Sequence, residues 1–387
     1  MDINSWLLNN KDRLFKIRRH IHSYPEVGFQ EFETSQFLQE ILTDSSFLIN
    51  KNKTMQTGFY TEYGTDTNLI LAIRCDLDAL PIEEKNNNQY SSKIKGVMHA
   101  CGHDAHMAIA TGTALYLQEN NIKIPGIVRF IYQPAEETAP GGAIAMIKGG
   151  AIENVNHIIG YHVFPKLSGN QVGIKDKYVS AAVEAHTLEF CGRGGHTSRP
   201  EETDDLINIV SEFITRINKN LDSIDNKEHF VLTFGHINAG YTFNVIPDKL
   251  LLKGTLRYLN KSDRELVYKI INELIDEFSS DNKVKIVHEV PYASPPVIND
   301  TSLTNIIYQS AISALGEKNV IRLEKPSMGG EDFSFYLDSC PGSYIRIGSN
   351  DGYTKDLHTP DFNIDEDCIL SGIQVLVKSI TNYFKLI

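Results

Sequence analysis

The chain has 387 residues, of which 41% are hydrophobic and 22% are charged, and its formal net charge is -12 at pH 7. This composition is typical of a soluble globular protein with enough apolar side chains for a real core, and the length suggests two domains or three. The acidic charge argues against nucleic acid and against an anionic membrane surface as partners, because both would repel the chain.

The N-terminal segment and the cysteines indicate a cytoplasmic protein. Residues 1–23 lack the apolar run that follows a basic start in a signal peptide. No stretch of the chain approaches the ~18 apolar residues of a membrane span. The five cysteines lie far apart, which is not the pattern of a disulfide framework. We therefore expect free thiols, no membrane partner and a location in the cytoplasm.

The first 180 residues are expected to alternate between helices and buried strands. Apolar residues at helical spacing predict a helix over residues 4–23, and a second helix is expected over residues 104–119. Short, β-branched apolar runs predict three buried strands, over residues 68–75, 126–132 and 155–163. This alternation is typical of an α/β domain whose sheet is mostly parallel.

The pattern changes near residue 180, where strands and two helices form an α+β arrangement. We expect strands over residues 185–191, 230–237, 250–258 and 283–290, with helices over residues 204–221 and 262–279. A capping box of Ser262 and Glu265 would open the second helix. Because motifs with active-site character resume after residue 326, we predict one domain from residues 1–182 and 294–387 and an inserted domain from residues 183–293.

The densest cluster of potential metal ligands lies in residues 99–106, which read His-Ala-Cys-Gly-His-Asp-Ala-His. Thiolate and imidazole are ligands that zinc, nickel, cobalt and manganese sites recruit. Cys101 and His103 stand at i, i+2, a spacing that puts both side chains on one side of an extended chain. A loop with surface histidines and a buried thiol would contain the same residues, so this stretch alone leaves both interpretations open.

Two further motifs follow predicted strands. Glu136 and Glu137 come directly after the strand over residues 126–132, and His162 ends the strand over residues 155–163. Ligands gather at the carboxyl ends of strands in open α/β sheets. Of two adjacent carboxylates, one can bind metal while the other transfers protons. The alternatives are an exposed acidic turn and a histidine satisfied within the core.

The remaining candidates lie in the inserted domain and near the C-terminus. His196 follows a glycine-rich loop, Asn244 precedes a predicted strand, and that strand carries Arg257, whose forked side chain suits a carboxylate. The alternative for Arg257 is a surface salt bridge. His358 and the segment 328–333 would alone be ordinary turns. The glycine loop of phosphate-binding proteins and the G-x-S-x-G motif of serine hydrolases are absent from the sequence.

The order of these motifs resembles the family of N-acyl-amino-acid amidohydrolases, which includes hippurate hydrolases, bacterial aminoacylases, N-acetyldiaminopimelate deacetylases and plant auxin-conjugate hydrolases. This family belongs to a wider clan of di-metal aminopeptidases and carboxypeptidases. The resemblance runs from residue 18 to the final helix. The motifs are, in order, Asp-Leu-Asp-Ala-Leu-Pro at 76–81, His-Ala-Cys-Gly-His-Asp at 99–104, Pro-Ala-Glu-Glu at 134–137, Tyr-His-Val-Phe-Pro at 161–165, Gly-Arg-Gly-Gly-His at 192–196, Met-Gly-Gly-Glu-Asp-Phe at 328–333 and Leu-His-Thr-Pro at 357–360.

The resemblance implies a zinc-peptidase-like catalytic α/β domain with a mixed, mostly parallel sheet, and an inserted α+β lid or dimerisation domain. It implies two divalent metal ions per subunit, with Zn, Mn, Ni and Co as the candidates. Glu136 would be the general base, and His196 would stabilise the oxyanion in its own or a partner subunit's site. By similarity, the metal ligands would be Cys101, His103, Glu137, His162 and His358.

The resemblance also assigns supporting roles and shows two departures. Asn244 and Arg257 would bind substrate, and Asp78 would support the metal site. Many relatives in the clan carry His two residues before that Asp, where this chain has Asp76, and several use a carboxylate in place of Cys101. Both departures fit the amidohydrolase branch and leave the identity of the metal open.

The sequence therefore predicts a metal-dependent amidohydrolase that cleaves N-acyl amino acids, which are small-molecule substrates. A homodimer or homotetramer is expected by similarity. Two alternatives remain at this point: a dipeptidase or carboxypeptidase of the same clan, and a non-catalytic metal-binding relative.

Overall fold

The structure is a computed structural model that describes residues 1–65, 68–224, 227–353 and 355–386. The chain divides into two compact units. Unit 1 comprises Met1–Val179, Val297–Lys325 and Asp332–Ile387, whereas unit 2 comprises Ser180–Pro296 and Pro326–Glu331. The predicted inserted domain, residues 183–293, lies within unit 2, which also takes in the short segment 326–331 that the sequence prediction assigned to the other domain.

Unit 1 is built on an eight-stranded sheet with the order β1-β2-β4-β3-β5-β16-β6-β15. The strands of unit 1 are β1 Ile49–Lys51, β2 Phe59–Gly64, β3 Ile70–Asp76, β4 Ile127–Gln133, β5 His157–Ser168, β6 Val172–Ile174, β7 Lys177–Ser180, β14 Val297–Asn299, β15 Val320–Arg322 and β16 Gly342–Asn350. The helices are α1 Ile3–Ser23, α2 Phe32–Asp44, α3 His103–Glu119, α4 Ala143–Lys148, α7 Thr301–Leu315, α8 Ser334–Leu337 and α9 Asp367–Leu386, with the 3-10 helix η3 Glu317–Asn319.

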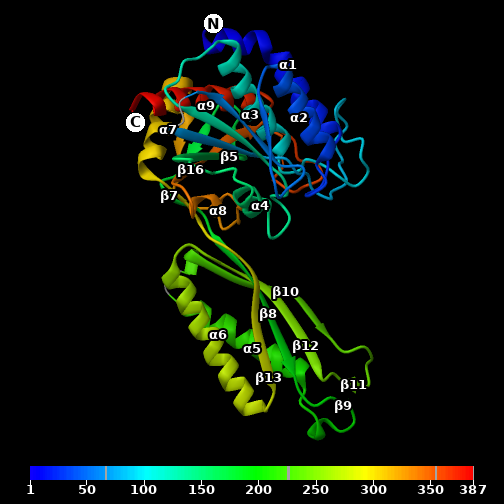
Figure 1. The fold of residues 1–387 in the computed structure, drawn as a ribbon. Helices are drawn as coiled ribbons and strands as arrows, with labels where there is room; N and C mark the ends of the chain where they lie inside the picture. The colour runs from blue at the N-terminus through cyan, green and yellow to red at the C-terminus, as the bar shows by residue number, and fades with distance from the viewer. Residues whose placement is uncertain (66–67, 225–226, 354, 387) are drawn as a thin grey trace. The chain divides into compact units, whose positions relative to one another are not determined.

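The centre of the sheet is parallel, as the sequence predicted. Strands β4, β3, β5 and β16 run parallel to one another. At one side β2 pairs antiparallel with both β4 and β1, and at the other side β16 pairs antiparallel with β6. Helices cover both faces of the sheet, with α1, α3, α7 and α9 on one and α4 and α8 on the other (Figure 1). Both faces of the central strands are therefore buried, which explains their continuous apolar runs.

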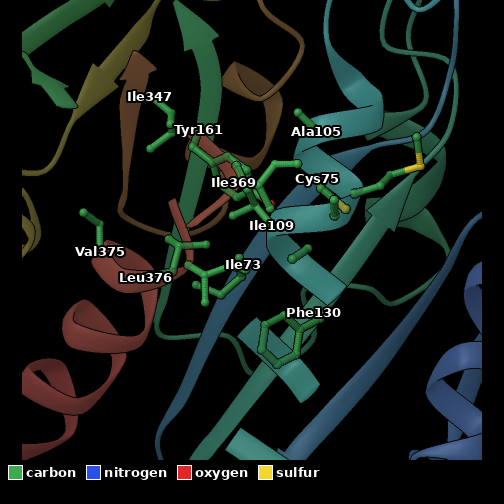
Figure 2. Packing of buried hydrophobic residues seen from close by; sticks show 14 of the residues in the cluster. Ile73, Cys75, Ala105, Ile109, Phe130, Tyr161, Ile347, Ile369, Val375 and Leu376 are labelled. Carbon is green, nitrogen blue, oxygen red and sulfur yellow. The ribbon is translucent and has the colours of Figure 1, made fainter. Parts of the chain in front are cut away.

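The main core lies between the sheet and helices α3 and α9. Figure 2 shows Ile73 of β3 and Phe130 of β4 packing with Ile109 of α3 and Leu376 of α9. Helix α3 is buried from His103 to Leu117, so it forms a central element rather than an amphipathic surface helix. Because α3 starts beside the ends of the parallel strands, its first residues are held rigidly where ligands gather in open α/β sheets.

Unit 2 is an α+β structure in which a four-stranded antiparallel sheet, ordered β10-β12-β8-β13, carries α5 and α6 on one face (Figure 1). Its elements are β8 Ala182–Cys191, β9 Gly195–His196, η1 Pro200–Glu202, α5 Leu206–Asp222, η2 Lys227–His229, β10 Phe230–Ala239, β11 Val245–Ile246, β12 Lys249–Tyr258, α6 Lys261–Asn282 and β13 Lys285–Ser294.

The predicted capping box of α6 is wrong. The N-cap residue is Asn260, whose side chain accepts a hydrogen bond from the Asp263 amide at 3.0 Å. Ser262 instead donates its hydroxyl proton to the Asn260 side chain at 2.6 Å. The helix therefore begins at Lys261, one residue earlier than expected, because Asn260, an equally good N-cap residue, lies two positions before the serine.

None of the helices in the described ranges is long and apolar enough to cross a membrane. The five cysteines, at positions 75, 101, 191, 340 and 368, are free.

A buried ion pair fastens the N-terminal helix to the start of α3. Arg18 of α1 is 1% exposed, and its Nε lies 2.7 Å from Asp104 Oδ2 while its Nη1 lies 3.1 Å from Glu366 Oε1. Asp104 directly follows His103 at the first turn of α3. The pair therefore ties α1 to α3 next to the predicted metal ligands.

Replacing Arg18 with methionine should lower the free energy of unfolding by about 3–5 kcal/mol, because Asp104 would be left as a buried charge without its main partner. Urea denaturation followed by circular dichroism measures the change. Arg13→Met is the matched control, since Arg13 pairs with Glu119 at the exposed surface, where an ion pair contributes little. Equal losses for the two variants would contradict a special role for the buried pair.

Candidate metal centre

The five side chains predicted as metal ligands lie close together in unit 1, beside the start of α3. Three groups of potential ligand atoms, each within 4.8 Å of one another, include Cys101 with His103 and His162, Cys101 with Glu137 and His358, and His103 with Glu136 and Glu137. The residues come from the start of α3, the loop after β4, strand β5 and the loop before α9. Segments far apart in the chain therefore supply one cluster.

A glycine and a histidine, both with a left-handed backbone conformation, set the path of the chain beside this cluster. Gly102, between Cys101 and His103, has φ +83, and a Cβ there would lie 2.5 Å from Val163 Cγ2. Only glycine fits this close turn, which directs both neighbours towards the site. His358 has φ 62, and its amide donates to the Ala100 carbonyl at 2.8 Å. This hydrogen bond attaches the C-terminal loop beside Cys101.

The donor atoms of the cluster face one another at short range. Cys101 Sγ lies 3.2 Å from His162 Nε2 and 3.3 Å from His358 Nε2. His358 Nε2 is in turn 3.0 Å from Glu137 Oε1. Thiol, imidazole and carboxylate are the donor set of transition-metal sites in proteins.

The outer hydrogen bonds leave two imidazoles ready to bind a cation. His103 Nδ1 donates to the Asp78 carbonyl at 2.8 Å, and His162 Nδ1 donates to the Val163 carbonyl at 2.7 Å. A carbonyl can only accept, so the proton of each neutral ring sits on Nδ1 and Nε2 presents its lone pair to the cluster. Within the described part of the chain, the buried His103 Nε2 has no hydrogen-bond partner. This orphaned atom fits a metal ligand.

The electrostatics of the site also favour a bound cation. Burial raises the pKa of the Cys101 thiol well above its usual value, and the carboxylates of Glu137 and Glu136 raise it further. Burial lowers the pKa of His103, but the negative charges of Asp76, Asp78 and Glu137 outweigh it and bring that pKa to about 10. A bound divalent ion would offset this excess of negative charge and favour the thiolate.

Asp78 holds the loop that carries Glu136 and Glu137. Its Oδ1 and Oδ2 accept the backbone amides of Glu136 and Glu137, each at 3.0 Å. The same residue holds His103 through its carbonyl. Asp78 therefore connects the loop that carries the predicted base with the start of α3.

The sequence reasoning did not single out His106, which belongs to the same motif. His106 Nδ1 donates to Asp76 Oδ1 at 2.6 Å, and its Nε2 accepts the Val163 amide at 2.9 Å. Both ring nitrogens are therefore occupied, so His106 positions the strand segment next to His162 and is not a free ligand. Its spacing of three residues from His103, on one face of a helix, was the available signal.

The motif Met-Gly-Gly-Glu-Asp-Phe contributes Asp332 to a buried network under the site. Asp332 Oδ1 accepts from Arg74 Nη2, and Oδ2 accepts from Gln133 Nε2, both at 2.7 Å. Arg74 Nη1 donates to Asp76 Oδ2 at 2.7 Å. Through Arg74, the motif is thus linked to the carboxylate that holds His106.

In unit 2, the structure brings His196 and Asn244 together but places Arg257 elsewhere. Val245, next to Asn244, pairs with His196 between β11 and β9, beyond the Cys191 end of β8. Arg257 pairs with Val183 at the opposite end of β8. Arg257 Nη1 donates to the Met328 carbonyl at 2.8 Å, so one nitrogen of the predicted substrate-binding residue fastens the segment 326–331.

The sequence was compared with known families and proteins. The profile of Peptidase family M20/M25/M40 matches residues 72–382. N-acetyl-L-cysteine deacetylase of Bacillus subtilis is 35% identical, over 95% of this chain and 87% of the relative. Thermostable carboxypeptidase 1 of Saccharolobus solfataricus is 31% identical, over 96% of each chain.

The fold was compared with solved structures. The crystal structure of a Bacillus subtilis protein, YXEP, described as a dinuclear metal-binding peptidase of the M20 family, matches with a TM-score of 0.86. Its sequence is 31% identical, and the match covers 97% of this chain and 98% of that one.

Proposed function

We propose that this chain, which belongs to peptidase family M20/M25/M40 and is a hydrolase of amide bonds, removes the acyl group from N-acyl amino acids. The observation that carries the proposal is the adjacency of Glu136 and Glu137: Glu137 lies in the cluster of ligand atoms, and Glu136 stands next to it in a loop held by Asp78. The deacetylase relative favours an N-acylated substrate.

The donor set fits two divalent ions per subunit, with Zn, Mn, Ni and Co as the candidates. Cys101, His103, Glu137, His162 and His358 would hold them. When bound, such ions lower the pKa of water towards neutrality and polarise an amide carbonyl. The free state of all five cysteines suits the reducing cytoplasm, which we propose as the location.

Glu136 is the proposed general base. Its carboxylate takes a proton from the attacking water as the oxygen adds to the amide carbonyl carbon. The same carboxyl then gives that proton to the nitrogen of the leaving amino acid, so that the products are a carboxylic acid and a free amine. Asp78 keeps this loop in place throughout, because it binds the backbone and not the reacting carboxylate.

His196 is the proposed oxyanion donor. Its Nδ1 accepts the Ser198 amide at 3.1 Å, which requires the neutral tautomer with the proton on Nε2. The residue is exposed, so we propose that this N–H is accessible to substrate. A preorganised donor of this kind contributes about 3–4 kcal/mol to transition-state stabilisation.

The positions of His196 and Arg257 support a shared site between two copies of the chain. The residues lie at opposite ends of β8, which over Val183 to Cys191 spans roughly 25 Å at about 3.3 Å per residue. An amide and the neighbouring carboxylate of its amino acid are only a few bonds apart. If Arg257 binds that carboxylate in one subunit, the oxyanion donor must be the His196 of the partner subunit.

We accordingly propose a homodimer formed through unit 2, or a homotetramer built from two such dimers. Strand β10 is an edge of the unit 2 sheet, and Ile237 on it is 56% exposed. In the loop that follows, Tyr241 is 87% and Phe243 is 95% exposed, beside Asn244. Natural proteins seldom leave an apolar edge uncovered. Sedimentation equilibrium tests this assembly, and a chain that stays monomeric at micromolar concentrations would contradict it.

A dipeptidase or carboxypeptidase is the second candidate, because one relative is described as a peptidase and another as a carboxypeptidase. We expect kcat/KM for N-acetyl amino acids to exceed that for dipeptides of the same C-terminal residue by about 100-fold, since a free α-amino group would bring a charge where a neutral acyl group fits. Amino acid release from matched substrate pairs measures the ratio. Faster cleavage of the dipeptides would replace the amidohydrolase assignment by the peptidase one.

A further inference from the structure

The loop that carries Glu136 and Glu137 is held by a second carboxylate besides Asp78. Glu31, which precedes α2, is fully buried. Its Oε1 accepts the Ala135 amide at 2.8 Å and the Phe29 amide at 3.0 Å, while its Oε2 accepts the Thr57 hydroxyl at 2.9 Å. Glu31 is far from the metal ligands in sequence, and none of the motifs described above includes it.

Glu31 and Asp78 together bind three consecutive backbone amides. Glu31 takes the amide of Ala135, and Asp78 takes those of Glu136 and Glu137. Ala135 has φ 53, a left-handed conformation that costs an L-residue energy and needs support from its surroundings. Two carboxylates on three successive amides supply that support, because charge-assisted hydrogen bonds are the strong ones.

The same loop is also packed closely from the N-terminal side. A Cβ on Gly28 would lie 2.7 Å from Thr138 Oγ1 and 3.2 Å from the Cα of Ala135. The segment that carries Glu31 therefore contacts both ends of the loop. A change in this segment would be transmitted directly to the carboxylates that follow Ala135.

We propose that Glu31 is a positioning residue of the reaction: by holding the Ala135 amide, it sets the direction in which Glu136 and Glu137 leave the end of β4. The inference rests on the function proposed above for these two glutamates. It assigns to Glu31 no contact with substrate or metal.

The hydrogen bonds at Glu31 predict which substitutions it tolerates. Oε1 of Glu31 accepts both backbone amides. The other position of the carboxyl group therefore needs only to form a hydrogen bond with the Thr57 hydroxyl. Glutamine keeps the acceptor for the two amides and can donate to the Thr57 hydroxyl. Alanine removes both functions.

The test compares Glu31→Ala, Glu31→Gln and Glu33→Ala as metal-loaded proteins, with Glu33 as the exposed neighbour that does not touch the loop. Glu31→Ala should lower kcat about 10–100-fold with KM within about 2-fold, the size typical of support residues behind a metal site. Glu31→Gln should recover most of that loss, and Glu33→Ala should match the wild type.

A second readout does not depend on turnover. Hydrogen–deuterium exchange of the peptide that contains residues 134–138 should be faster in Glu31→Ala than in the wild type, and near wild type in Glu31→Gln. If Glu31→Ala fails to fold, Gly28→Ala, whose added Cβ would crowd Thr138 and Ala135 of the same loop, should lower kcat and speed exchange there.

Unchanged exchange in Glu31→Ala, or an equal loss of kcat in Glu33→Ala, would overturn the positioning role. A wild-type enzyme that cleaves no N-acyl amino acid would overturn the proposed function. In that case faster exchange in Glu31→Ala would still support the hold of Glu31 on the loop.

Discussion

Replacing Glu136 with glutamine should reduce kcat for an N-acyl amino acid by about 1,000-fold or more while the metal stays bound. The amide side chain has nearly the same shape but cannot accept a proton from water, and loss of a general base costs about 100- to 10,000-fold. The Asp78 hydrogen bonds go to the backbone of Glu136 and Glu137, so the loop should keep its conformation. Stopped assays of amino acid release give kcat.

Metal content, measured by atomic emission on the same samples, separates chemistry from binding in this experiment. Glu83→Gln, an exposed carboxylate of the same unit, serves as the control and should keep full activity. A Glu136→Gln protein with full metal and substantial kcat would rule out the proposed base.

The second large effect is expected at His103. His103→Ala should abolish activity and weaken metal binding by more than the 10–100-fold typical of substitutions behind the ligands. The side chain belongs to several of the ligand groups, and its Nε2 has no hydrogen-bond partner within the described residues. Removing it would take away the imidazole that belongs to one ligand group with Cys101 and His162 and to another with Glu136 and Glu137. Titration with Zn or Mn, followed by calorimetry, measures the affinity.

His157→Ala is the matched control for this prediction. His157 opens β5 of the same unit, and its ring bonds Tyr383 at 2.9 Å, outside the ligand groups. Metal affinity should be unchanged in this variant. If His103→Ala bound metal as tightly as His157→Ala does, the metal centre would have to lie elsewhere.

Local sequence patterns predicted the long elements because their apolar residues repeat with the period of the structure. The helix expected over residues 104–119 is α3, His103–Glu119, and the strand expected over residues 126–132 is β4, Ile127–Gln133. The patterns could not show that β16, near the C-terminus, lies between β5 and β6 in the sheet. That placement depends on long-range packing, which leaves no local periodicity.

The residues of the candidate site could likewise be predicted only in part from the sequence. His358 alone was an ordinary turn residue, and only the order of the motifs linked it to Cys101, which the structure places 3.3 Å away. The positioning roles of His106 and Glu31 could not be predicted because their partners include backbone amides, which carry no residue-specific signature. The separation of His196 from Arg257 could not be predicted from the sequence either, because it follows from the register of β8 and β12.

The central claim is that a divalent ion held by this cluster enables hydrolysis of N-acyl amino acids. The most direct test is amino acid release from acetyl, benzoyl and long-chain N-acyl amino acids after chelation, and again after Zn, Mn, Co or Ni is added. We predict that chelation abolishes release and that at least one metal restores it. Absence of turnover with every metal, in protein shown to bind that metal at Cys101 and His103, would contradict the account.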